Sequence, residues 1–224
     1  MTSFGNKEYF DAYVRKNEQT PCENCGIRNR HRTSRLCRQC SNNYQRTGHP
    51  SGRVLKYADI REELIVMNKV VEMNPDHEGI KLGIEFLVNR LTKAKDNQVF
   101  TGSDYYRRIA RNADDQKIQE YARSLLIVLS AIWFAFHRGR TLIKDETHLN
   151  TMLGHHVCRF RPLPRGHWIP VKLRQNIGKD CRHNVGVLFV NMSKAGDDIE
   201  KVRETQAGIM ENTLNTKGPK DAIW

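Results

Sequence analysis

Residues 21–50 read PCENCGIRNRHRTSRLCRQCSNNYQRTGHP and contain four of the six cysteines of the chain. Cys22 and Cys25 form one pair with two residues between them, and Cys37 and Cys40 form a second such pair. This gap lets both thiolates of a pair reach one ion from a tight turn, and two pairs complete the closed tetrahedral site typical of structural zinc. We therefore expect one structural zinc ion bound by these four thiolates. Four free thiols or an iron site are the alternatives.

The cysteine segment is also strongly basic. Between Pro21 and Lys56 the sequence has eight Lys and Arg residues and one acidic residue, Glu23, which gives a net charge of +7. Because the segment has few large apolar residues, we expect the metal to supply its folding energy. A loop braced by zinc holds guanidinium groups at fixed spacing, which suits phosphates or base edges. The candidate nucleic-acid contacts are Arg28, Arg30, Arg32, Arg35, Arg38 and Arg46. A solvated loop with arginines for solubility is the other interpretation.

The run LCRQCSNNYQRTGHP at 36–50 resembles the second half of small zinc modules in bacteriophage and mobile-element proteins. Those modules combine Leu-Cys-x-x-Cys or Leu-Cys-x-x-His with a short helix that carries Tyr and Arg, and then Gly-x-Pro. The resemblance is confined to residues 21–50. It implies a zinc-ribbon or treble-clef-like arrangement in which the second ligand pair opens a helix. It also implies a nucleic-acid partner, DNA more than RNA, because some members bind DNA and others are fused to endonucleases.

Outside this segment the sequence predicts a mainly α fold. Residues 1–20 form an N-terminal helix or arm, and from residue 57 apolar residues recur at helical spacings of three and four. Two such stripes, joined by a short turn, predict an antiparallel helical hairpin: Tyr57, Ile60, Leu64, Met67 and Val71, then Ile80, Ile84, Leu87 and Leu91. A long helix at 114–138 and another at 145–157 follow. The apolar run SLLIVLSAIWFAF at 124–136 predicts that the long helix lies in the centre of a helical bundle.

The pattern is weaker near the C-terminus. The apolar stretches at 168–171 and 185–190 predict short strands or buried turns, and thus a minor β element near the C-terminus. A last helix is expected at 194–214. The expected organisation is an arm at 1–20, a zinc module at 21–56, a helical domain at 57–158 and a basic region with the last helix at 159–224.

The charge of the whole chain favours a polyanionic partner. Lys and Arg number 37 and Asp and Glu 25, a net charge of +12, which favours nucleic acid first and an anionic membrane surface second. The apolar run of thirteen residues is too short to cross a bilayer as a helix, and the first eight residues have no apolar leader. We therefore expect a cytoplasmic protein with no membrane partner, in a bacterial host if it is phage-encoded, with reduced thiols.

Two further basic stretches are candidate nucleic-acid contacts. A short helix expected at 104–111 places Tyr106 beside Arg107 and Arg108, and tyrosines next to arginines can stack on bases. The loop after residue 159 contributes Arg161 and Arg165 to a possible second phosphate-binding surface. The alternative for both stretches is a set of solvated arginines.

An enzyme is the less favoured interpretation. Eleven residues between the cysteine pairs are too few for an HNH nuclease hairpin, and His31 is the single histidine among them. A metal-dependent nuclease would instead need a second metal at a C-terminal cluster, which contains His155, His156, Cys158, Cys181 and His183. The spacing of this cluster fits no zinc signature, so partly buried polar side chains are the favoured interpretation. A third hypothesis is an adaptor whose zinc module docks a protein partner.

Overall fold

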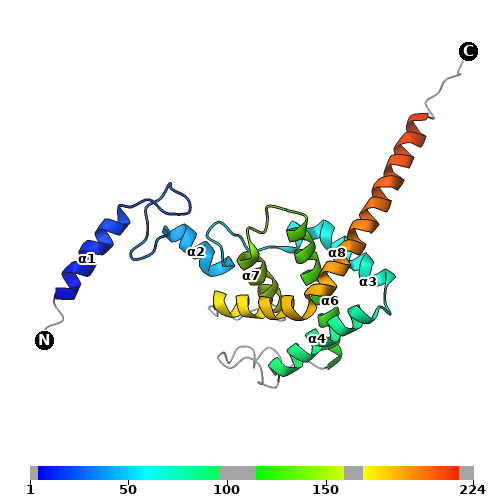
Figure 1. Ribbon diagram of the computed structural model, residues 1–224, viewed down its shortest axis with the longest axis horizontal. Helices are drawn as coiled ribbons and strands as arrows, with labels where there is room; N and C mark the ends of the chain where they lie inside the picture. Colours follow the sequence, from blue (N-terminus) through cyan, green and yellow to red (C-terminus); the bar gives the residue numbers. More distant parts are fainter. Residues whose placement is uncertain (1–4, 96–114, 159–168, 217–224) are drawn as a thin grey trace, which may run out of the picture. The chain divides into compact units, whose positions relative to one another are not determined.

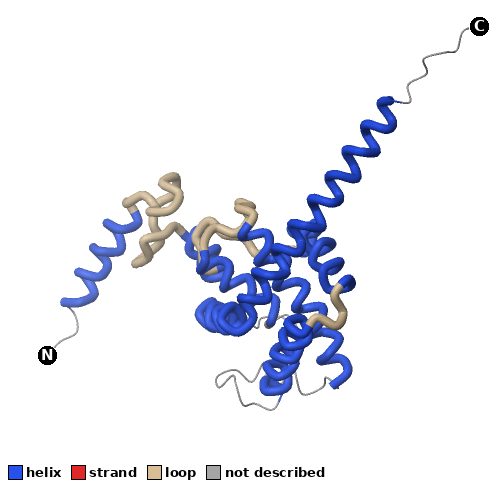
Figure 2. Tube along the Cα trace, turned by 45° about the vertical axis from the view of Figure 1, so that its right-hand side comes forward, coloured by secondary structure: helices blue, strands red, loops and turns tan. Residues whose placement is uncertain are grey.

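The computed structural model describes residues 5–95, 115–158 and 169–216. Over these residues the chain forms helices and connecting loops without a strand (Figures 1 and 2), which confirms the mainly α prediction. The elements are α1 (Gly5–Glu18), α2 (Arg38–Thr47), a 3-10 turn at Tyr57–Ile60, α3 (Arg61–Met73), α4 (Glu78–Lys95), α6 (Asp115–His137), α7 (Glu146–Val157) and α8 (Val171–Thr216).

The chain forms two compact units that are discontinuous in sequence. The first comprises Met1–Ile60 and Ala135–Asn184, and the second comprises Arg61–Phe134 and Val185–Trp224. The cysteine segment belongs to the first unit, together with α1, α2, α7 and the first part of α8. The stretch 57–158, which the sequence suggested as one domain, is divided between the two units.

The second unit is built around the two helical stripes that the sequence predicts. Met67 and Val71 of α3 are buried, as are Leu87 and Leu91 of α4. A Cβ on Gly196 of α8 would meet the Met67 side chain at 2.6 Å, so α8 approaches α3 closely there. Both predicted helices are therefore present, and each buries apolar residues in the second unit.

Helix α6 supplies the most apolar part of this core. By length and composition the stretch Gln116–His137 could cross a membrane, but 61% of that window is buried inside the protein. Leu126, Leu129, Ile132 and Phe134 are almost fully buried. Burial of these side chains confirms the expectation that the helix lies in a protein core.

The expected minor β element is wrong for residues 185–190. These residues lie inside α8, which continues without interruption from Val171 to Thr216. The valines at 185, 187 and 190 favoured a strand by local propensity, but Val185, Leu188 and Phe189 are buried on one helical face. Packing of that face overrides the preference of valine for strands. Residue 168 lies outside the described residues.

In the first unit, α7 and the start of α8 touch backbone to backbone. A Cβ built on Gly154 of α7 would lie 1.8 Å from the carbonyl oxygen of Arg174. A Cβ on Gly178 of α8 would lie 1.8 Å from the carbonyl oxygen of Asn150. The two glycines therefore form a reciprocal contact in which each helix leaves room for the backbone of the other.

His148 of α7 is buried and uses both ring nitrogens. The backbone N–H of Lys144 donates to Nδ1 over 3.2 Å, and Nε2 lies 3.0 Å from the carbonyl oxygen of Arg53. These partners require the neutral tautomer with its proton on Nε2. Burial lowers the pKa of His148 by more than the Arg53 carbonyl raises it. The first unit therefore holds this imidazole in its neutral form.

Acidification should destabilise the first unit through His148. A proton on Nδ1 would face the Lys144 N–H, whereas the unfolded chain takes up that proton freely near pH 6.5. The contribution of His148 to the free energy of unfolding is therefore fully present above about pH 6.5. It falls as pH drops toward the lowered pKa of His148, by up to about 1.4 kcal/mol per pH unit. Denaturant unfolding at pH 7.5 and 5.5 measures this. His148→Gln should show a weaker pH dependence than the parent, and His183→Gln, at an exposed position, should match the parent. Equal slopes for all three proteins would contradict the role of His148.

Candidate metal centre and its basic loop

The structure brings the four cysteines of the segment together. The Sγ atoms of Cys22, Cys25, Cys37 and Cys40 all lie within 4.8 Å of one another, and three of the four residues are buried. The Sγ atoms of Cys25 and Cys37 lie 3.9 Å apart. Four thiolates at 2.3 Å from one zinc ion form a tetrahedron with edges of about 3.8 Å. The donor set and its spacing could therefore hold one metal ion.

The first cysteine pair sits on a tight turn that leaves its N–H groups near the sulfurs. The Gly26 N–H donates to the Cys22 carbonyl over 2.9 Å, and Gly26 has a φ of 65°. This left-handed conformation favours glycine. The Cys22 N–H donates to the Arg28 carbonyl over 2.8 Å, which closes the turn.

The second pair opens α2. Cys37 is the N-cap of this helix, and its sulfur accepts the backbone N–H of Cys40 over 3.5 Å. The Asn24 side-chain amide donates to the Cys40 sulfur over 3.3 Å. The same Asn24 accepts a hydrogen bond from the Ser51 hydroxyl over 3.0 Å. The sequence analysis missed Asn24, because an Asn between two cysteines carries no signal of its own.

The thiols of the cluster differ in their proton affinity. Burial raises the pKa of Cys22, but hydrogen bonds from backbone N–H groups, those of Cys25 and Cys37 first, outweigh burial and lower it to about 6. The backbone N–H groups of Arg28 and Ile27 lower the pKa of Cys25. Burial raises the pKa of Cys40 to about 12. The turn of the first pair thus favours thiolates, the form that binds metals.

The module has almost no apolar core besides these cysteines. Its buried cluster consists of Cys22, Cys37 and Cys40, against which Cys25 and Leu36 pack. Ile27 is 88% exposed. A segment of this size and polarity cannot fold on hydrophobic burial alone. A metal ion held by the four cysteines would supply stabilisation that this small cluster lacks.

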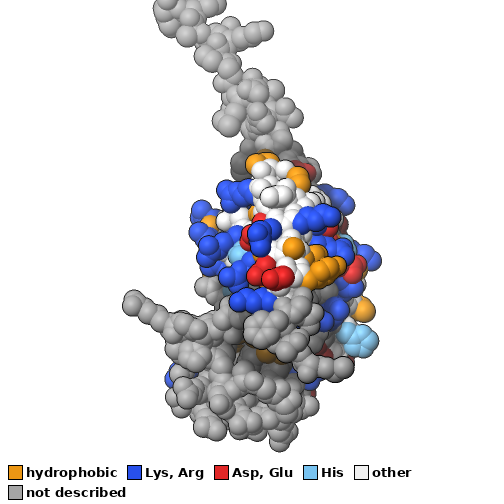
Figure 3. All heavy atoms as spheres, turned by 90° about the vertical axis from the view of Figure 1, so that its left-hand side faces the viewer, with side chains coloured by type: hydrophobic (Ala, Val, Ile, Leu, Met, Phe, Trp, Pro, Cys, Tyr) orange, Lys and Arg blue, Asp and Glu red, His pale blue; other side chains and the backbone are white. Residues whose placement is uncertain are grey.

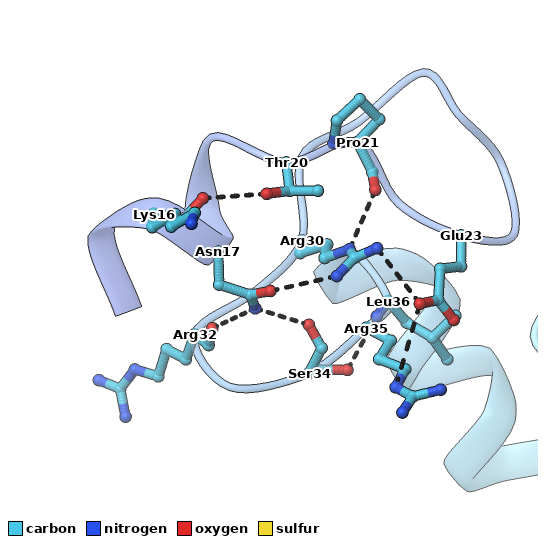
Figure 4. A network of polar contacts seen from close by, with 10 residues as sticks. All are labelled: Lys16, Asn17, Thr20, Pro21, Glu23, Arg30, Arg32, Ser34, Arg35 and Leu36. Atoms are coloured by element: carbon cyan, nitrogen blue, oxygen red, sulfur yellow. Dashed lines mark hydrogen bonds and ion pairs between the residues drawn. The ribbon is translucent and has the colours of Figure 1, made fainter. Parts of the chain in front are cut away.

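The loop between the cysteine pairs is tied to the end of α1, as Figure 4 shows. Asn17 is buried at the last turn of α1, and its amide donates to the carbonyls of Arg32 and Ser34. The Arg30 N–H donates to the Thr20 carbonyl over 2.9 Å. These bonds fix the loop against α1, which the sequence analysis did not foresee.

Arg30 belongs to this internal network. Its guanidinium donates to the Pro21 carbonyl over 3.1 Å and to Oδ1 of Asn17 over 3.4 Å, and it pairs with Glu23 at 3.2 Å. Its side chain is 23% exposed. Arg30 therefore braces the loop, and of the six predicted arginines in the module it is the least available to a ligand.

The other predicted arginines of the module lie on its surface. Arg32 has a φ of 50°, and its side chain points away from the network in Figure 4. Arg35 is 81% exposed and approaches Glu23 only at 4.0 Å. The remaining exposed residues are Arg28, Arg38 and Arg46. Five of the six predicted arginines are therefore exposed to solvent.

A buried arginine fixes α2 against the other helices of the first unit. Arg174 of α8 is 5% exposed, and its guanidinium donates to the carbonyls of Gln45 and Arg46 at the end of α2. A cation at this end of a helix also interacts favourably with the helix dipole. Because α2 also packs on α7, the helix that begins after Cys37 is held by contacts with both α7 and α8. Arg174 is therefore a structural residue and cannot contribute to a phosphate-binding surface.

The remaining sequence candidates do not form a second centre that the structure describes. Tyr106, Arg107, Arg108, Arg161 and Arg165 lie outside the described residues. Of the C-terminal histidines and cysteines, His156, Cys158 and Cys181 are buried, whereas His183 is exposed. Across residues 5–95, 115–158 and 169–216, the four cysteines of the module are the one group whose ligand atoms converge on a metal-sized site.

No family model, no curated protein and no solved structure matches this chain.

Proposed function

We propose that the four cysteines bind one zinc ion and that the loop they brace binds nucleic acid, DNA more than RNA. The observation that carries the proposal is the exposure of Arg28, Arg32 and Arg35 on a loop that lies between the two cysteine pairs and is bonded to Asn17, with Arg38 and Arg46 exposed on the adjoining α2. A cation whose backbone is already ordered loses less entropy when it contacts a phosphate. Zinc is favoured because four converging thiolates at this spacing are its usual structural ligand set.

The charge of the surrounding surface supports the same partner. Figure 3 shows many Lys and Arg side chains, with Asp and Glu side chains between them, on the face that α1 occupies at the left of Figure 1. The net charge of +7 between Pro21 and Lys56 would attract any polyanion. A regulator or recruiting subunit of a phage or mobile element fits this role, although that setting is supported by the sequence resemblance alone.

A salt series on the full-length protein tests the proposal. Binding of a labelled oligonucleotide should weaken steeply as salt rises, because each phosphate contact releases counterions. Arg28→Ala and Arg32→Ala should each reduce the slope of log K against log salt by about 1. Arg123→Ala, at an exposed position of α6 in the second unit, is the matched control and should leave the slope unchanged.

Three results would count against the proposal. Absence of binding at low salt would exclude nucleic acid as the partner. A flat salt dependence would exclude phosphate contacts. An equal effect of Arg123→Ala and Arg32→Ala would show that net charge, and not the braced loop, causes the binding. Weak nucleic-acid binding together with an intact metal site would favour a protein-docking module.

A further inference from the structure

Helix α1 exposes three aromatic side chains within little more than one turn. Tyr9 is 80% exposed, Phe10 53% and Tyr13 51%. Single exposed apolar residues are common on protein surfaces, but a contiguous group of large rings marks an interaction site. Three rings that remain exposed to water contribute little to the stability of the fold. Packing in the core therefore does not account for their presence on α1.

The aromatic residues lead directly to the basic loop. Phe10 and Tyr13 precede Asn17 by seven and four residues. These spacings place all three side chains on one face of the α-helix. Asn17 is the residue whose amide donates to the Arg32 carbonyl. The ring-bearing face of α1 is therefore the face to which the loop is attached, and α1 and the loop form one continuous surface.

The chemistry of this surface selects its partner. Arg28 and Arg32 are exposed on the loop that is bonded to α1, and Arg15 and Lys16 are exposed cations near the end of α1. Figure 3 likewise shows hydrophobic side chains beside Lys and Arg side chains on this face. A second copy of the chain would bring two modules of +7 together, which charge repulsion opposes. A ligand with negative charges and flat apolar rings is complementary to both features.

Unpaired nucleic acid offers such rings along a backbone of phosphates. In a duplex the base faces are stacked inside the helix, whereas single strands and loops expose them to aromatic side chains. Phe10 and Tyr13 are separated by about 4.5 Å along the helix axis, so both rings can contact one short stretch of a strand. Stacking of this kind tolerates any base sequence, because every base has a π face.

We infer that α1 and the loop form one site for single-stranded nucleic acid, in which Phe10 and Tyr13 stack on unpaired bases while Arg28 and Arg32 contact phosphates. Tyr9 borders the same stripe and adds a third ring at its edge. This inference rests on the proposed nucleic-acid function and specifies its substrate as unpaired strands.

The test compares fluorescence anisotropy of a single-stranded and a duplex oligonucleotide of equal length, with the full-length protein. The parent should prefer the single strand. Phe10→Ala and Tyr13→Ala should each weaken single-strand binding roughly tenfold and leave the salt slope unchanged, because rings contact no phosphate. Tyr13→Phe should retain binding, since it keeps the ring. Leu82→Ala, at an exposed apolar position of α4, is the control for loss of surface apolar area.

The outcomes separate this inference from the proposed function. Binding of both oligonucleotides with no effect of the α1 variants would overturn the single-strand site and leave the arginine loop as a nucleic-acid binder. Failure to bind either oligonucleotide at low salt would overturn both. A dimeric parent that becomes monomeric in Phe10→Ala, measured by light scattering, would show that the rings pair with a second copy and would also overturn the inference. Circular dichroism and zinc content of each variant confirm that folding is unchanged.

Discussion

Replacing Cys37 with serine should unfold the cysteine module and leave the second unit folded. Cys37 is both a candidate metal ligand and the N-cap of α2, and it lies in the small buried cluster of the module. Structural zinc contributes roughly 10–16 kcal/mol of apparent binding energy in small zinc modules, far more than any other contact available to this loop. Loss of one of four ligands removes most of that energy.

Hydrogen exchange measured by mass spectrometry reports the effect region by region. Amides at 20–40 should lose their protection in Cys37→Ser, whereas those of α3 and α6 should keep it. Zinc content should fall from one ion per chain to a small fraction. Cys181→Ala is the matched control, since Cys181 is a buried cysteine of α8 outside the cluster. It should keep the zinc and the protection of the module. Protected amides at 20–40 in Cys37→Ser would contradict the idea that metal folds this segment.

Replacing Gly178 with alanine should cause the largest loss of stability among substitutions away from the metal centre. The new Cβ would lie 1.8 Å from the Asn150 carbonyl oxygen and 2.6 Å from its carbon, both backbone atoms of α7. No side-chain rotation relieves this clash, so α7 and α8 must separate. We expect a cost of at least about 3 kcal/mol, the upper end of overpacking penalties, or a fall in Tm of roughly 6–12 °C.

Differential scanning calorimetry of Gly178→Ala and Gly154→Ala measures this cost, and the two variants should behave alike because their contact is reciprocal. Gly83→Ala is the control. Its Cβ would meet the Cδ2 atom of Leu188 at 2.5 Å, the end of a flexible side chain that can shift. Its effect should therefore be clearly smaller. A Tm of Gly178→Ala within 2 °C of the parent, about 1 kcal/mol or less, would show that the helices cross with more room than the structure gives them.

The sequence predicted the features whose signal is local. Two cysteine pairs with short gaps identify a metal site because the turn geometry is contained in four residues. The helical stripes of α3 and α4 are also local, and both were found within a few residues of their ends. The helix α6 was recognised from one apolar run.

Features that depend on tertiary packing were not predictable. The stretch 185–190 has the valines of a strand, and only the core that buries Phe189 decides that it is helical. Arg30, Arg32 and Arg174 look alike in sequence, yet Arg30 braces the loop, Arg32 is exposed, and Arg174 is buried against α2. The roles of these arginines differ because of partners that lie far away in the sequence. The Arg174 guanidinium, for example, donates a hydrogen bond to the Arg46 carbonyl.

Nucleic-acid binding should depend on the metal. If the four thiolates hold zinc and thereby brace the arginine loop, binding and metal occupancy must change together. Anisotropy titrations should be made before and after removal of zinc with a strong chelator, and again after one equivalent of zinc is returned. The account predicts that affinity is lost with the metal and restored by one zinc ion per chain. Unchanged affinity in the metal-free protein would contradict it.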